Sequence, residues 1–257
     1  MKGKGGLSRW PGSGREYEDG KEFGEPLGGI MSLCGLVKEL CGLDERAWCA
    51  YAWSREPLAG RISDSRKWEL FQRAAQCGRQ EAAWAFGVLD EGGREPEGPS
   101  APVRLARRLG LTVEADEAEN GGGQVIFAQY EEPSQIRISM DCLRRGEALL
   151  ETSGLKGLLG PASLLEVILA HEIFHALEYR KRSVIYTRTL RERIWKWPVF
   201  GRAPVWCLGE IAGMEFARAL TGMPVSPYIL DAVLLYAYSP QGAAALAEEI
   251  RALSQGV

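Results

Sequence analysis

Two histidines, the only ones in the 257-residue chain, lie four residues apart in an apolar stretch over residues 164–179. His171, Glu172 and His175 form the pattern H-E-x-x-H. Side chains four residues apart share one face of a helix, so both imidazoles can bind the same metal ion. A carboxylate in the position of Glu172 can take a proton from water that the metal has acidified. The pattern therefore predicts a zinc site with His171 and His175 as ligands and Glu172 as the catalytic general base of a metallopeptidase.

The local sequence places this motif inside a helix. Ser163 and Glu166 stand three residues apart just before the apolar run, a capping-box pattern that marks a helix N-terminus. Titratable side chains are costly in apolar surroundings unless something satisfies them, and a bound metal ion would do so. The alternative is a structural helical protein whose two histidines are satisfied in the core without a metal.

A catalytic zinc ion usually has three protein ligands, so a third must be found. No histidine remains, which leaves a downstream carboxylate, with the candidates Glu178, Glu192, Glu210, Glu215 and Asp231. Glu210 is favoured because Gly213 and Ala217 share its face of a helix expected over residues 205–221. Small residues there would allow a close approach to the histidine helix.

The other carboxylates fit less well. Glu215 lies roughly 140° around the same helix from Glu210, so the two cannot face one ion together. Glu178 is expected to point away from the histidine face, and Glu192 lies in a basic loop. The predicted metal site therefore combines the two histidines with Glu210.

The elements around the motif predict an α+β fold that is mostly helical, with a small antiparallel sheet packed on the histidine helix. Apolar spacing indicates helices from about residue 31 to 92, and a Gly-, Pro- and Glu-rich stretch follows. A helix stopped by Gly110 then leads into a strand, and two further segments around "EEPS" form a hairpin. We expect a disordered tail over 1–30, a helical segment over 31–95 and a zinc metallopeptidase domain over 96–257.

Composition limits the partners and the compartment. The formal net charge is −3, which provides no chain-wide attraction to nucleic acid or to an anionic membrane. No secretory signal is recognisable, and Glu166 and Glu172 interrupt the longest apolar run, so no membrane helix is expected. The six cysteines include no C-x-x-C pair, which favours buried thiols in a reducing compartment. We expect a soluble, cytoplasmic protein.

The connection over residues 180–202 is rich in arginine and lysine and holds a single acid, Glu192. It is interpreted either as a docking surface for an acidic partner or as a solvated loop. A tyrosine hydroxyl could stabilise an oxyanion in a reaction at the site. The candidates, none of which the sequence singles out, are Tyr179, Tyr186, Tyr236 and Tyr238.

Four segments together resemble the ImmA/IrrE-type zinc metallopeptidases. They are "RLARRLGLTV", "IRISM", "ILAHEIFHALEY" and "EIAGMEFARALTGMP", and the resemblance covers roughly residues 101–230. It implies a zincin-like fold in which His171, His175 and Glu210 bind zinc and Glu172 is the base. The Met-Pro pair lies one residue further from the Phe-Ala pair than in the family pattern, and the connection before the last segment is long.

The resemblance also implies a substrate class. Members of that family often cleave a repressor, usually a helix-turn-helix protein. The predicted function is a zinc-dependent endopeptidase that cleaves a specific intracellular protein such as a transcriptional repressor. The alternative is a regulatory zinc-binding protein of the same fold without turnover, which the intact Glu172 disfavours.

Overall fold

The computed structural model describes residues 32–91, 99–118, 127–193 and 201–255. The tail expected over 1–30 and most of the Gly-, Pro- and Glu-rich stretch that follows residue 92 lie outside these residues. The α-helices are α1 (Leu33–Cys41), α2 (Glu45–Ser54), α3 (Asp64–Asp90), α4 (Ala101–Arg108), α5 (Met140–Thr152), α6 (Leu164–Arg180), α7 (Tyr186–Thr189), α8 (Cys207–Thr221), α9 (Ile229–Tyr236) and α10 (Pro240–Gln255). The strands are β1 (Thr112–Asp116), β2 (Ala128–Glu131), β3 (Gln135–Ser139), β4 (Glu192–Arg193) and β5 (Arg202–Ala203). The mostly helical fold with a small sheet is therefore as predicted.

The three-stranded sheet is mixed, and the prediction of an antiparallel sheet was wrong for one strand. β2 and β3 form the expected antiparallel hairpin, but β1 runs parallel to β3 on its other side. A tight turn dictates the direction of β2 relative to β3, whereas β1 precedes the hairpin and its pairing depends on tertiary packing. Tyr130 and Ile136 are among the side chains that the sheet buries against α6, while β1 is largely exposed.

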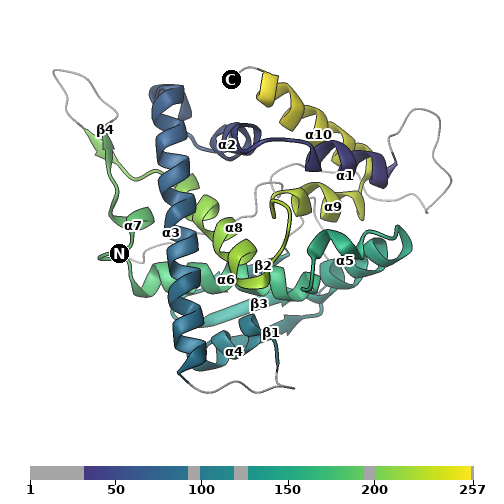
Figure 1. Cartoon of the computed structure of the whole chain (residues 1–257), viewed down its shortest axis with the longest axis horizontal. Coiled ribbons are helices and arrows are strands. Elements are labelled where there is room, and N and C mark those ends of the chain that lie inside the picture. The colour runs from purple at the N-terminus through teal and green to yellow at the C-terminus, as the bar shows by residue number, and fades with distance from the viewer. Residues whose placement is uncertain (1–31, 92–98, 119–126, 194–200, 256–257) are drawn as a thin grey trace.

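The histidine helix α6 is the central element of the core. It packs against the sheet and α4 and also against α8, which in turn lies along the 27-residue helix α3. Figure 1 shows α3 running from top to bottom on the left of the view, with α8 beside it and with α6 and the sheet at the level of its lower half. Residues 156–180 are long and apolar enough to cross a membrane by composition alone, but α6 is buried nearly all round inside this protein. A helix that is apolar on every face is typical of such a core position.

The helical segment over 31–95 shares this core. Leu70 and Phe71 of α3 belong to the same buried cluster as Ile211 of α8 and Ile173 of α6. A Cβ added at Gly78 would lie 2.1 Å from the carbonyl oxygen of Ala212, so α3 and α8 touch backbone to backbone there. α3 is thus part of the surface on which α8 rests.

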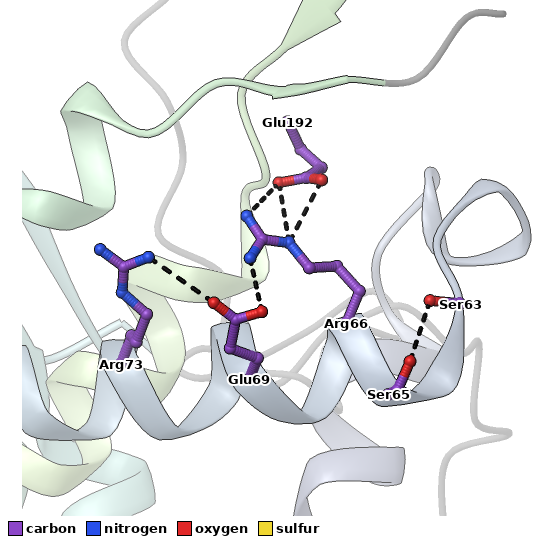
Figure 2. Close-up of polar contacts among 6 residues, drawn as sticks. All are labelled: Ser63, Ser65, Arg66, Glu69, Arg73 and Glu192. Atoms are coloured by element: carbon purple, nitrogen blue, oxygen red, sulfur yellow. Dashed lines mark hydrogen bonds and ion pairs between the residues drawn. The ribbon is translucent and has the colours of Figure 1, made fainter.

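The short β4–β5 ribbon is attached to α3 by an arginine. Figure 2 shows the Arg66 guanidinium between two carboxylates, with Nη2 at 2.9 Å from Glu192 Oε2 and Nη1 at 2.6 Å from Glu69 Oε2. Glu192 is mostly covered by the pairing, and both of its oxygens accept from the Arg66 side chain. This carboxylate, one of the candidate metal ligands, is therefore paired with Arg66 and does not belong to the group formed by the histidines.

Candidate metal centre

His171, His175 and Glu210 converge at one point between α6 and α8. The two imidazole Nε2 atoms are 3.0 Å apart, and the Glu210 carboxylate lies 3.3 Å from His171 Nε2 and 3.5 Å from His175 Nε2. Among the described residues these three form a group able to hold a metal ion, with their ligand atoms within 4.8 Å of one another. Ligand atoms about 2.0–2.1 Å from a tetrahedral zinc ion lie roughly 3.3 Å from one another. The observed spacing therefore fits a single cation between the three side chains.

The position of both histidines follows from the start of α6. The Ser163 hydroxyl accepts from the Glu166 N–H at 3.3 Å, and the Glu166 carboxylate accepts from the Ser163 N–H at 2.6 Å. This capping box, predicted from the sequence, determines where the helix begins and hence which face carries His171 and His175. Both imidazoles are buried, so the packing of the surrounding residues also restricts their orientation.

The close approach of α8 depends on Gly213. A Cβ at this position would lie 3.0 Å from Cε1 and 3.1 Å from Nδ1 of His171. The absence of a side chain allows α8 to lie directly against the imidazole, as the sequence predicted. Glu210, one turn earlier on α8, then reaches both histidines.

The N-terminus of α8 is held by a carboxylate that the sequence did not reveal. Glu56, which follows α2 and is buried, accepts from the N–H groups of Trp206 at 2.7 Å and of Cys207 at 3.1 Å. These donors belong to the first turn of α8, where backbone N–H groups have no partner within the helix. Glu56 therefore anchors the turn that carries Glu210 from 150 residues away in sequence.

The electrostatics of the centre favour a positive charge between the ligands. Burial opposes the charged form of His175, but the nearby Glu210 and Glu178 carboxylates outweigh it and raise the pKa of His175 to about 9. Burial likewise disfavours the Glu210 carboxylate, yet the two imidazoles lower its pKa. A carboxylate kept ionised beside two imidazoles is a suitable donor set for a divalent metal ion.

Two of the other candidate ligands are paired elsewhere. Glu215 accepts from Arg79 at 2.8 Å, and Asp231 accepts from the Tyr51 hydroxyl at 2.7 Å. Glu215 thus faces away from the histidines, as its position on α8 predicted.

The prediction that Glu178 points away from the histidines was wrong. Its Oε2 lies 3.6 Å from Nδ1 of His175, on the side of the ring opposite to the Nε2 that faces Glu210. The same oxygen is 2.8 Å from the Arg188 guanidinium. Residues three apart on a helix are neighbours, and an acid in an otherwise apolar helix was the sequence signal for this contact.

Glu172 lies on α6 directly after His171, and its side chain is completely buried, with 0% exposure. Its charge contributes to the raised pKa of His175, which places it close to the centre. Of the ligands, Glu210 is the most open, with 20% of its side chain exposed. The centre is therefore largely closed to solvent.

Two basic side chains of the connection over residues 180–202 and two of the candidate tyrosines make contacts within the protein. Lys181 pairs with Glu81 at 2.6 Å, so it and Arg188 are directed toward the protein. The Tyr238 hydroxyl donates to Asp141 at 2.8 Å, and the ring of Tyr186 lies under Arg73. Lys196 and the neighbouring tryptophans of the connection lie outside the described residues.

Comparisons with models of protein families, with curated proteins and with solved structures found no match. The conclusions about this chain therefore rest on its sequence and on the geometry of the centre. These define a buried two-histidine, one-carboxylate group able to hold a metal ion.

Proposed function

We propose that this protein is a zinc-dependent endopeptidase of the ImmA/IrrE type that acts on a specific protein substrate. The observation that carries the proposal is the convergence of His171, His175 and Glu210 at spacings of 3.0 to 3.5 Å. Two imidazoles and one carboxylate are a known donor set for catalytic zinc, and three protein ligands leave one position open.

The roles of the residues follow from the motif. Zinc, when bound, supplies a Lewis acid that polarises a scissile carbonyl and lowers the pKa of water. His171, His175 and Glu210 would hold the ion, and each imidazole, in its neutral form, would offer the Nε2 atom that faces the centre. Glu172 accepts a proton at its carboxylate from the water that attacks the scissile carbonyl, and delivers it to the amine that departs as the C–N bond breaks. The burial of these side chains keeps bulk water away from the proton transfers.

The substrate class rests on the resemblance of residues 101–230 to the ImmA/IrrE family. We propose a cytoplasmic protein, such as a helix-turn-helix repressor, as the substrate.

One observation favours a second candidate function. Glu172 is fully buried, and a general base without exposed surface meets a substrate only if the surrounding elements open. A protein that binds zinc and a partner without turnover needs no such opening. This regulatory role is the alternative to peptidase activity.

Metal analysis and a single isosteric variant separate these possibilities. Wild type and Glu172→Gln are each co-expressed with the proteins encoded beside the gene, and the zinc content of each purified chain is measured. The peptidase proposal expects stoichiometric zinc in both and cleavage of a neighbour by the wild type alone. Zinc in both with no cleavage would support the regulatory role, and cleavage by the variant would contradict the assignment of Glu172.

A further inference from the structure

The carboxylate of Glu178 stands behind the metal centre, and the peptidase chemistry proposed above assigns it no part. Its side chain is 3% exposed although it carries a charge, and it lies between α6, α7 and α8. A buried charge is costly unless it is paired. The contacts of its two carboxylate oxygens therefore indicate which groups stabilise the buried charge of Glu178 and which group that charge acts on.

One oxygen of Glu178 joins His175 to α7. Oε2 lies 3.6 Å from His175 Nδ1 and 2.8 Å from a guanidinium nitrogen of Arg188. Nε2 of the same imidazole faces His171 and Glu210. An imidazole that binds a metal through Nε2 carries its proton on Nδ1, and that N–H points at Glu178.

The other oxygen occupies a space that α8 leaves open. A Cβ at Gly209 would lie 2.9 Å from Glu178 Oε1 and 3.3 Å from Oε2. Gly209 directly precedes the ligand Glu210. A side chain at position 209 would push the carboxylate away from His175, so the glycine makes room for Glu178 beside the ligand-bearing turn.

We infer that Glu178, fixed by Arg188 and accommodated by Gly209, is a positioning residue that orients His175 for metal binding. It holds the proton of His175 on Nδ1, keeps Nε2 turned toward Glu210, and increases the electron density on Nε2. Metal-ligating histidines commonly donate their second N–H to a carboxylate, and loss of such a partner typically lowers metal affinity by about 10- to 100-fold. This inference rests on the proposed metal site.

The test measures zinc affinity by competition with a chelator and records the visible spectrum of the cobalt(II)-substituted full-length protein. Glu178→Gln keeps the shape of the side chain and removes its charge. We expect a 10- to 100-fold weaker zinc affinity and altered cobalt absorption bands. Glu215→Gln is the matched control, because it also removes a largely buried carboxylate paired with an arginine but does not touch the centre. It should retain the wild-type affinity and spectrum.

A second variant keeps the test decisive if Glu178→Gln folds poorly. Arg188 is 37% exposed at its side chain, so Arg188→Gln should fold, and it should weaken zinc binding to a smaller extent. In the Glu178→Gln background the same change should add nothing, because Arg188 acts on the histidine only through that carboxylate.

The outcomes distinguish this inference from the proposed function. Wild-type protein without stoichiometric metal would overturn both. Wild-type protein with zinc, together with a Glu178→Gln variant of unchanged affinity and cobalt spectrum, would overturn the positioning role alone. Equal losses in Glu178→Gln and Glu215→Gln would assign both carboxylates to general stability and would likewise overturn it.

Discussion

At the scale of single residues, the centre is defined by which atom of each side chain faces inward. His171 and His175 present Nε2 to each other, and Glu210 completes the group from a second helix. Without an ion, two nitrogens at this distance can share one proton in a hydrogen bond, in which one imidazole donates and the other accepts. A metal ion would instead accept a lone pair from both imidazoles and from Glu210 at the same time.

The role of Glu210 leads to a prediction about metal content. Glu210→Ala should lower zinc affinity by more than the roughly 10- to 100-fold that loss of a supporting contact costs, because the proposed site loses one of its direct ligands. Chelator competition on the purified full-length protein measures this. Glu215→Ala, on the same helix but paired with Arg79, should bind zinc as the wild type does. Undiminished zinc in Glu210→Ala would remove this residue from the ligand set.

A second residue-scale prediction concerns Asp231, which is buried near Tyr51. Burial raises the pKa of Asp231 to about 7, although the hydrogen bond from Tyr51 and the charge of Arg55 act in the opposite direction. The folded protein thus keeps a proton that the unfolded chain loses near pH 4. The contribution of this group to stability is fully present below about pH 4 and is lost as pH rises to about 7, by up to about 4 kcal/mol.

Asp231→Asn should remove this pH dependence, because the amide can still accept from Tyr51 and does not ionise. Urea unfolding at pH 5 and at pH 8 measures the effect. The free energy of unfolding of the variant minus that of the wild type should be larger at pH 8 than at pH 5. A constant difference between variant and wild type across this range would show that Asp231 is ionised throughout.

At the scale of elements, the contact between α3 and α8 is limited by Gly78. A methyl group there would lie 2.1 Å from the Ala212 carbonyl oxygen, which cannot move without shifting α8. We expect Gly78→Ala to lower the free energy of unfolding by about 1–3 kcal/mol through overpacking. Thermal or urea unfolding of the metal-free protein measures this loss. Zinc affinity should fall too, since Glu210 moves with α8.

Gly87 provides the control on the same helix. A Cβ at Gly87 meets nothing within 4 Å, so Gly87→Ala should increase stability by about 0.5–1 kcal/mol through helix propensity alone. If both substitutions stabilised the protein, the close contact between α3 and α8 would not exist in solution.

At the scale of the whole molecule, the buried cluster runs from α1 through α3 to α6, α8 and α9. The segment over residues 31–95 carries Glu56 and Gly78, and both of these act on α8. This arrangement connects the metal centre to a part of the chain that the sequence suggested as a separate unit.

Truncation tests this connection. A chain that begins at residue 96 loses α3 and exposes the apolar face of α8, so we expect aggregation or a loss of cooperative unfolding. A chain that begins at residue 32 keeps every described helix and should unfold cooperatively. Circular dichroism with thermal melting compares the two. A cooperative, zinc-binding fragment from residue 96 would establish an independent domain.

Much of this structure follows from local signals in the sequence. The capping box at Ser163 places α6, and the alternation around Pro133 indicates the β2–β3 hairpin, because both depend on neighbours within a few residues. Glu210 was deduced from helix periodicity and from the small residue at Gly213. Each of these patterns involves residues that lie only a few positions apart in the sequence.

Other features depend on contacts between distant segments and were not predictable in this way. The partner of Glu56 lies 150 residues further along the chain, and no local pattern indicates it. The parallel pairing of β1 depends on packing around β3 rather than on a turn. The contact of Glu178 is with Nδ1 of His175, and the sequence does not show which imidazole nitrogen is turned toward Glu210 and which toward Glu178.

The two glycines that make room on either side of α8 have different consequences for suppressor genetics. At Gly78 the obstacle to a larger residue is the backbone of Ala212, so no substitution of the side chain at 212 can compensate. At Gly209 the obstacle is the Glu178 carboxylate, which a shorter residue would remove. A screen for second-site changes that restore the stability of Gly209→Ala, with no selection for zinc binding, should therefore recover changes at position 178, whereas Gly78→Ala should yield none at 212.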